Sequence, residues 1–180
     1  MDIIRLKKKI CMLGQFGVGK TSLTNRFVHN RFEEKYLTTI GVKVCQKTLP
    51  PLTAGRGHRN IQYDFLIWDI AGIEKFDMMI KNYYQGAAGA LAVADLTRME
   101  TVEALQEIVE KFITVVPAAK LIFLGNKIDL SEPGQTGRKK IQKLADNFAG
   151  EFLFTSAKTG EKVEEAFLKL AEKVDSSSNE

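Results

Sequence analysis

The segment that most constrains this 180-residue chain is a glycine-rich octapeptide that fits the pattern G-x-x-x-x-G-K-[ST] at every position, Gly14-Gln15-Phe16-Gly17-Val18-Gly19-Lys20-Thr21. An apolar run precedes it and an amphipathic segment follows, so it lies between a predicted strand and a predicted helix. There, glycines let backbone N–H groups approach phosphate oxygens, and the helix N-terminus adds a favourable dipole. The motif predicts a phosphate-binding loop, in which Lys20 reaches the outer phosphates and Thr21 ligates Mg²⁺.

Apolar runs alternate with amphipathic ones along the rest of the chain, which predicts an α/β fold with a mostly parallel sheet. The predicted strands are Ile10–Leu13, Ile40–Thr48, Ile61–Trp68, Ala87–Ala94, Lys120–Leu124 and Phe152–Thr155. The predicted helices are Lys20–His29, Thr101–Val115, Gly137–Ala149 and Lys162–Val174. We expect one domain over residues 1–174 and a polar, disordered tail over 175–180. Ligands of such sheets bind at the C-terminal ends of the strands.

Composition narrows the function classes. Hydrophobic residues make up 44% of the chain and charged residues 27%, as in an ordinary globular protein. The net charge is +4, and the lysines and arginines are scattered along the chain, apart from the run Arg5–Lys9, which leads into a predicted strand. We therefore expect no nucleic-acid partner. Cys11 and Cys45 are far apart and favour a reduced, cytoplasmic protein. No apolar run approaches the ~18 residues that a membrane helix needs. We also expect the protein to be a monomer.

A second motif addresses which nucleotide the loop would hold. Asn126-Lys127-Ile128-Asp129 follows a predicted strand, and Asp129 could accept hydrogen bonds from the N1–H and amine of guanine, which adenine does not offer. Asn126 would tie this segment to neighbouring backbone, and the Lys127 stem would cover one ring face. Ser156-Ala157-Lys158 after the last strand would form a second wall, with the Ala157 N–H donating to guanine O6. This set opposes an ATPase or a small-molecule kinase.

A third group would sense the outermost phosphate. Asp69 ends a predicted strand and is placed to hold Mg²⁺, and the N–H of Gly72 could bind the γ-phosphate. Thr39, in the loop after the first helix, is the candidate for a second Mg²⁺ ligand, although Thr38 is adjacent. A loop that is anchored only when metal and γ-phosphate are present would act as a switch.

With these motifs in order, the chain resembles the Ras superfamily of small GTPases, and among its branches most of all the Rab family. The residues that carry the resemblance are Gly14–Thr21, Thr39–Val42, Trp68–Gly72, Tyr83–Ala87, Asn126–Asp129 and Ser156–Lys158. The resemblance implies the P-loop small-GTPase fold, with a six-stranded, mostly parallel sheet and about five helices. It implies GTP and GDP with Mg²⁺ as ligands. Effector proteins would bind at two switch segments, Asn30–Val42 and Ile70–Tyr84, and an exchange factor and an activating protein would regulate the chain.

The site residues expected from the motifs and the resemblance fall into three sets. Those expected to contact nucleotide are Gly14, Gln15, Phe16, Gly17, Val18, Gly19, Lys20, Thr21, Ser22, Phe32, Tyr36, Thr39, Gly72, Asn126, Lys127, Asp129, Ser156, Ala157 and Lys158. Phe32 would flank the guanine and Tyr36 would lie over the phosphates. The expected metal ligands are Thr21, Thr39 and Asp69. Lys20, Thr39 and Gly72 would act on the γ-phosphate during hydrolysis.

The chain departs from the family in ways that bear on catalysis. Ile73 stands where the family has the glutamine that orients the attacking water, and isoleucine has no donor or acceptor. Intrinsic hydrolysis should therefore be slow. Glu74 is the nearest polar substitute, although an exposed surface position is the alternative. Phe16 is bulky where the family has a small residue, and its ring either crowds an arginine finger or lies outward over a switch.

Two further departures concern partners. The tail carries no cysteine, so we expect no lipid anchor in this chain, whether it is truncated or works without lipid. The Leu49–Asn60 connection is longer than the family's hairpin and is either a partner surface or a tolerated insertion. Two hypotheses remain: a slow GTP-hydrolysing switch, which the intact metal set favours, and a GTP-locked scaffold without meaningful turnover, which Ile73 and Phe16 favour.

Overall fold

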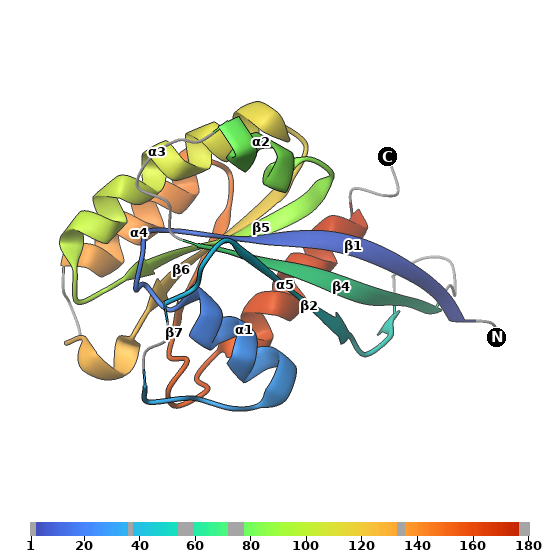
Figure 1. Cartoon of the computed structure of the whole chain (residues 1–180), viewed down its shortest axis with the longest axis horizontal. Coiled ribbons are helices and arrows are strands. Elements are labelled where there is room, and N and C mark those ends of the chain that lie inside the picture. Colours follow the sequence, from blue (N-terminus) through green and yellow to red (C-terminus); the bar gives the residue numbers. More distant parts are fainter. Residues whose placement is uncertain (1–2, 36–37, 54–59, 72–77, 133–135, 177–180) are drawn as a thin grey trace.

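A single twisted sheet forms the centre of the computed structural model, which describes residues 3–35, 38–53, 60–71, 78–132 and 136–176 (Figure 1). The strands follow the order β2-β4-β1-β5-β6-β7, and the short β3 pairs with β4. β2 is antiparallel to β4, and the other long strands pair in parallel. The six-stranded, mostly parallel α/β fold expected from the sequence is confirmed.

The described elements have the following bounds. The strands are β1 (Ile3–Leu13), β2 (Val42–Thr48), β3 (Leu52–Thr53), β4 (Asn60–Ile70), β5 (Ala87–Asp95), β6 (Lys120–Asn126) and β7 (Glu151–Thr155). The helices are α1 (Lys20–His29), α2 (Met78–Tyr84), α3 (Met99–Val115), α4 (Thr136–Asn147) and α5 (Val163–Ser176), with a 3₁₀ turn at Ile128–Leu130. The predicted helices and strands agree with these bounds to within a few residues, apart from β1.

Alternation along β1 shows how the sheet separates two cores. Ile10 and Met12 belong to a cluster covered by α1 and α5, whereas Cys11 and Leu13 belong to a cluster covered by α2, α3 and α4 (Figure 1). Successive side chains of a strand point to opposite faces of the sheet, so a continuous apolar run indicates a strand that is buried on both faces. On the first face, Phe27 of α1 stacks on Phe167 of α5 with ring centroids 3.9 Å apart.

Three parts of the fold were not predicted from the sequence. β1 begins at Ile3 rather than Ile10, because Ile3 to Met12 pair in register with Asn60 to Asp69 of β4. The lysine run therefore lies within the strand, and Lys9 Nζ lies 3.8 Å from the Trp68 ring centroid. Helix α2 was not predicted as an element, and the Leu49–Asn60 connection contains β3.

The chain end also differs from the expected tail. Helix α5 continues to Ser176, and Asp175, expected to be disordered, is 8% exposed and accepts a hydrogen bond from Tyr63 Oη at 2.6 Å. The polar sequence was misleading because this carboxylate is satisfied by a buried hydroxyl far away in the sequence. Residues 177–180 of the expected tail lie outside the described residues.

Candidate functional site

The phosphate loop, Gly14 to Thr21, turns the end of β1 into the start of α1, at the centre of the sheet. Gly14 has φ 141°, and a Cβ built on it would lie 2.2 Å from the Val93 carbonyl oxygen. Gly19 has φ 104°, and its Cβ would lie 2.3 Å from Asn126 Nδ2. Both positions need glycine, because the backbone there is left-handed and packed closely against neighbouring atoms.

Lys20 is directed back into the phosphate loop. Its ammonium donates hydrogen bonds to the backbone carbonyls of Gly14 and Gln15, both at 2.8 Å, and the residue is 6% exposed. Desolvation lowers its pKa to about 8, although the charge of Asp69 acts in the opposite direction. An anion in the loop would stabilise the charged form further, so this lysine is placed to hold a phosphate.

The three expected metal ligands lie together. Thr21 Oγ1 lies 2.7 Å from Thr39 Oγ1 and donates to Asp69 Oδ2 at 2.5 Å. Asp69 is fully buried, and within the described part of the chain its Oδ1 has no hydrogen-bond partner. Burial raises the pKa of Asp69, against the hydrogen bond from Thr21 and the charge of Lys20. A buried carboxylate oxygen without a partner, beside two hydroxyls, suits the oxygen-preferring Mg²⁺.

The base loop, Asn126 to Asp129, follows β6 and is tied to the phosphate loop. Asn126 is 1% exposed, and its amide nitrogen donates to the Val18 carbonyl at 2.9 Å. Its amide oxygen accepts from Thr155 Oγ1 at 3.2 Å and from the Ala157 N–H at 3.3 Å. The predicted tie between Asn126 and neighbouring backbone is confirmed. The Ala157 N–H, expected to face guanine O6, makes this long bond to Asn126.

The other base-loop side chains are held from neighbouring elements. Ser156 is fully buried, and its hydroxyl donates to Asp129 Oδ1 at 2.6 Å, which orients an otherwise exposed carboxylate. Lys127 Nζ lies 2.7 Å from Asp95 Oδ2. Arg26, which sequence reasoning missed, donates from α1 to the carbonyls of Ala157 and Lys158 at 2.9 and 2.6 Å. Its role could not be found from the sequence, because it bonds to backbone far along the chain.

Most of the expected site residues line one cavity of about 700 Å³, a size typical of small-ligand pockets. The expected residues that line it are Gly17, Gly19, Thr21, Ser22, Phe32, Thr39, Asn126, Lys127, Asp129, Ala157 and Lys158. Residues that line it without having been expected are Asn25, Glu33, Glu34, Lys35, Thr38, Ile40, Lys43 and Leu130. Most of these belong to the loop after α1 or to β2, where no motif marks them.

Other expected residues lie beside this cavity or outside the described residues. Phe16 and Lys20 line a small recess of about 20 Å³ next to Thr21 and Thr39, and the Phe16 residue is 41% exposed. Ser156 does not line the large cavity; it supports Asp129 instead, which corrects its expected place in the wall. Gly14, Gln15 and Val18 do not line it either and contribute backbone to the loop. Tyr36, Gly72, Ile73 and Glu74 lie outside the described residues.

Sequence comparison agrees with this geometry. The profile described as "Ras family" matches residues 9–176. The chain belongs to the Ras family. Its similarity to Rab proteins supports a place near that branch of these GTPases: it is 33% identical to mouse Ras-related protein Rab-22A over 93% of this chain and 84% of the relative.

Other relatives give the same assignment. The chain is 35% identical to Dictyostelium discoideum Ras-related protein Rab-1C, over 91% of this chain and 78% of that protein. It is 37% identical to rat Ras-related protein Rab-4B, over 91% and 74% of the two chains. Within the described residues of this Ras-family chain, no helix is long and apolar enough to span a bilayer.

Proposed function

We propose that this Ras-family chain is a molecular switch that binds GTP and GDP with Mg²⁺ and hydrolyses GTP slowly. The observation that carries the proposal is that the phosphate loop and the base loop face one cavity and are joined by the Asn126–Val18 hydrogen bond. A ligand that reached both loops would need phosphates at one end and a hydrogen-bonding base at the other. A guanine nucleotide meets both requirements.

Guanine is favoured over adenine by Asp129. Its carboxylate borders the cavity and is held by Ser156 Oγ at 2.6 Å, so its direction is fixed before a base arrives. Guanine offers two N–H donors to such a carboxylate, whereas adenine would leave it unpaired. Charge-assisted hydrogen bonds contribute about 1.5–3 kcal/mol each, so two correspond to roughly 10²–10⁴-fold preference.

Mg²⁺, when bound, would neutralise charge on the outer phosphates, and Thr21, Thr39 and Asp69 are the residues that would hold it. Lys20 would bind the β- and γ-phosphates, and the backbone N–H of Gly72 would bind the γ-phosphate. Ile73 supplies no group to orient water, so the reaction would rely on positioning and electrostatics alone, unless Glu74 substitutes. Slow intrinsic hydrolysis is the consequence.

The switch would act through the loop that carries Thr39. This residue contacts Thr21 across 18 positions, so a metal and γ-phosphate would fix the segment Asn30–Val42. Ile40 is 91% exposed, and Met79 in the second switch segment, Ile70–Tyr84, is 55% exposed. Apolar side chains on segments that order with GTP would form a surface for effector proteins. An exchange factor and an activating protein would regulate such a slow cycle.

A GTP-locked scaffold is the second candidate, favoured by Ile73 and by the bulk of Phe16 beside Lys20 and Thr39. Single-turnover hydrolysis of preloaded Mg²⁺-GTP separates the two: GDP that accumulates over hours supports the switch. GTP that stays bound and intact supports the scaffold.

Base choice is tested by Asp129→Asn, with the exposed helix residue Asp146→Asn as the matched control. GTP affinity should fall by roughly 10²-fold or more in the first variant, since one carboxylate acceptor is replaced by a neutral amide. The control should bind as the wild type does. Unchanged GTP affinity in Asp129→Asn, or equal affinity of the wild type for ATP and GTP, would contradict the assignment.

A further inference from the structure

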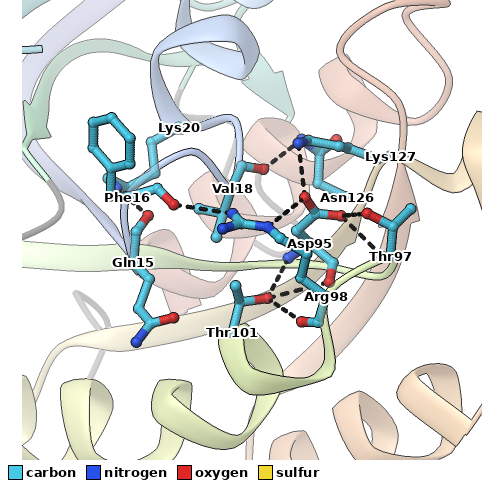
Figure 2. A network of polar contacts seen from close by, with 10 residues as sticks. All are labelled: Gln15, Phe16, Val18, Lys20, Asp95, Thr97, Arg98, Thr101, Asn126 and Lys127. Carbon is cyan, nitrogen blue, oxygen red and sulfur yellow. Dashed lines mark hydrogen bonds and ion pairs between the residues drawn. The ribbon is translucent and has the colours of Figure 1, made fainter. Parts of the chain in front are cut away.

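A buried carboxylate that no sequence motif marked lies between the phosphate loop and the base loop. Asp95 is the last residue of β5 and is 1% exposed. It accepts hydrogen bonds from the Thr97 N–H at 2.9 Å and the Thr97 hydroxyl at 2.7 Å. On its other oxygen, it pairs with Arg98 Nε at 3.1 Å and Lys127 Nζ at 2.7 Å (Figure 2).

Asp95 remains anionic in this position. Burial opposes its ionisation, but the hydrogen bonds from Lys127 and Thr97 outweigh burial and hold its pKa below the ordinary value. The turn that carries it is also fixed, because Thr101 Oγ1 accepts from the Asp95 N–H at 2.9 Å and donates to the Arg98 carbonyl at 2.7 Å. The carboxylate is therefore a rigid, charged support.

Arg98 connects this support to the phosphate loop. While its Nε faces Asp95, its Nη2 donates to the backbone carbonyl of Phe16 at 2.9 Å (Figure 2). The guanidinium is planar and presents several donors in a fixed fork, so one side chain holds two acceptors at once. A lysine ammonium at the end of a flexible stem does not reproduce this geometry.

The bond to the Phe16 carbonyl has a consequence on the opposite side of the same peptide. The carbonyl of Phe16 and the N–H of Gly17 belong to one planar trans unit, in which they point in opposite directions. Arg98 holds the carbonyl, and neither Phe16 nor Arg98 is among the residues that line the cavity bordered by Gly17. Fixing the carbonyl thereby fixes the direction of the Gly17 N–H, one of the groups that would meet phosphate.

We propose that Arg98 is a positioning residue that orients the Phe16–Gly17 peptide of the phosphate loop, and that Asp95 couples this peptide to Lys127 of the base loop. The proposal rests on the proposed guanine-nucleotide binding and adds two residues that act through others rather than by contact. One carboxylate thus orients both the phosphate loop and the base loop. A change at Asp95 should therefore affect binding of both ends of the nucleotide, whereas a change at Arg98 should affect binding of the phosphate end.

The test compares Arg98→Ala, Arg98→Lys and Asp95→Asn in the full chain, purified with Mg²⁺-GDP. Dissociation constants for GDP and for GMP are measured by competition with a fluorescent GDP analogue. Arg98→Ala should weaken GDP by about tenfold, the scale of one charge-assisted hydrogen bond, and GMP by about twofold or less, because the β-phosphate is missing. Arg98→Lys should resemble Arg98→Ala. Asp95→Asn should weaken GDP and GMP together, since Lys127 also loses its partner.

The matched control is Lys140→Ala, which removes a cation whose ion pair, Lys140 Nζ to Glu103 Oε1 at 2.6 Å, lies on the exposed surface away from the cavity. It should leave both dissociation constants unchanged. Phosphorus NMR of bound GDP gives a second readout: the β-phosphate resonance should move in Arg98→Ala and stay in place in Lys140→Ala. A merely structural arginine would weaken GDP and GMP equally and leave that resonance unmoved.

Each result counts for or against the proposal. Equal loss of GDP and GMP affinity in Arg98→Ala, wild-type GDP affinity in that variant, or full recovery in Arg98→Lys would overturn it. If the wild-type chain bound neither GDP nor GMP, the proposed function itself would fail. A wild type that binds GDP while Arg98→Ala behaves identically would overturn only the positioning role.

Discussion

The side-chain amide of Asn126 donates to the backbone carbonyl of Val18 at 2.9 Å, which joins two loops separated by 108 positions in the sequence. The same side chain accepts from the Ala157 N–H, so three loops at the C-terminal end of the sheet share one buried amide. Buried polar groups of this kind are costly to leave unpaired. Asn126 therefore both lines the cavity and holds together the loops that surround it.

Asn126→Ala should lower the free energy of unfolding by about 1–3 kcal/mol, since the Val18 carbonyl and the Ala157 N–H lose their partner. It should also accelerate release of the GDP that the proposed function assigns to the cavity. Urea unfolding and nucleotide-release kinetics measure the two effects. Asn147→Ala, at the exposed end of α4, is the control and should change neither. Release at the wild-type rate from Asn126→Ala would contradict the bridging role.

Gly14→Ala should be more damaging than substitution of a positive-φ glycine that has open space around it. Its Cβ would lie 2.2 Å from the Val93 carbonyl oxygen, a backbone atom of the central sheet that cannot move aside. Gly86→Ala is the comparison, because Gly86 also has positive φ but a Cβ there meets nothing within 4 Å. We expect Gly86→Ala to cost about 1 kcal/mol in unfolding free energy and Gly14→Ala clearly more. Equal losses would show that the phosphate loop can shift.

Tyr63→Phe should lower the free energy of unfolding without changing nucleotide affinity. The phenol donates to Asp175 at 2.6 Å, and removing it leaves a carboxylate that is only 8% exposed without this partner. The expected loss is about 1–3 kcal/mol. In a double-mutant cycle with Asp175→Ala, the second substitution should cost less in the Tyr63→Phe background. Additive losses would mean that the two residues do not stabilise the fold through each other.

The two cysteines should differ in reactivity. Cys11 is fully buried and donates to the Tyr83 carbonyl at 3.6 Å, and desolvation raises the pKa of its thiol to about 12. Cys45 is partly exposed. At pH 8, alkylation followed by mass spectrometry should modify Cys45 in the folded protein and Cys11 only after unfolding, because the thiolate is the reactive form. Rapid labelling of native Cys11 would contradict its burial.

The raised pKa of the Cys11 thiol also predicts that the stability of the fold depends on pH. Below the ordinary thiol pKa of 9.0, Cys11 is protonated in both states and contributes no pH dependence. Above it, the unfolded chain loses the proton while the folded chain retains it, so stability should fall as pH rises from about 9 to about 12. In Cys11→Ala, the free energy of unfolding measured with urea should fall less over this pH range than it does in the wild type.

Motifs predicted the chemistry of the site because each requires particular residues at short spacing. The phosphate loop and the base loop were both located from consecutive residues, and the cavity between them contains most of the side chains expected. Arg26, Asp95 and Arg98 were missed because the contacts that tie them to the site reach distant backbone carbonyls or a side chain of another loop, although Asp95 and Arg98 also pair with each other within one turn. A single sequence carries no local pattern for such contacts.

Periodicity predicted most elements, but not their full extent. β1 continues to Ile3 through Lys7 to Lys9, because the parallel partner β4 offers backbone hydrogen bonds along its whole length. Charged residues do not end a strand when their side chains leave the core, as Lys9 does over the Trp68 ring. The seven-residue α2 was missed because it is too short for a clear helical period.

The sequence by itself determined the fold class and predicted the positions of the phosphate loop and the base loop, because glycine conformation, strand alternation and motif spacing are local properties. The sequence predicted Thr21, Thr39 and Asp69 as ligands of one metal, and the structure places their oxygens together. Tertiary structure alone decided that Asp175 is buried against Tyr63. It also decided that the carboxylate of Asp95 lies within reach of Lys127, 32 positions further along the chain. These contacts depend on strand order and packing, which bring distant residues to within a few ångströms.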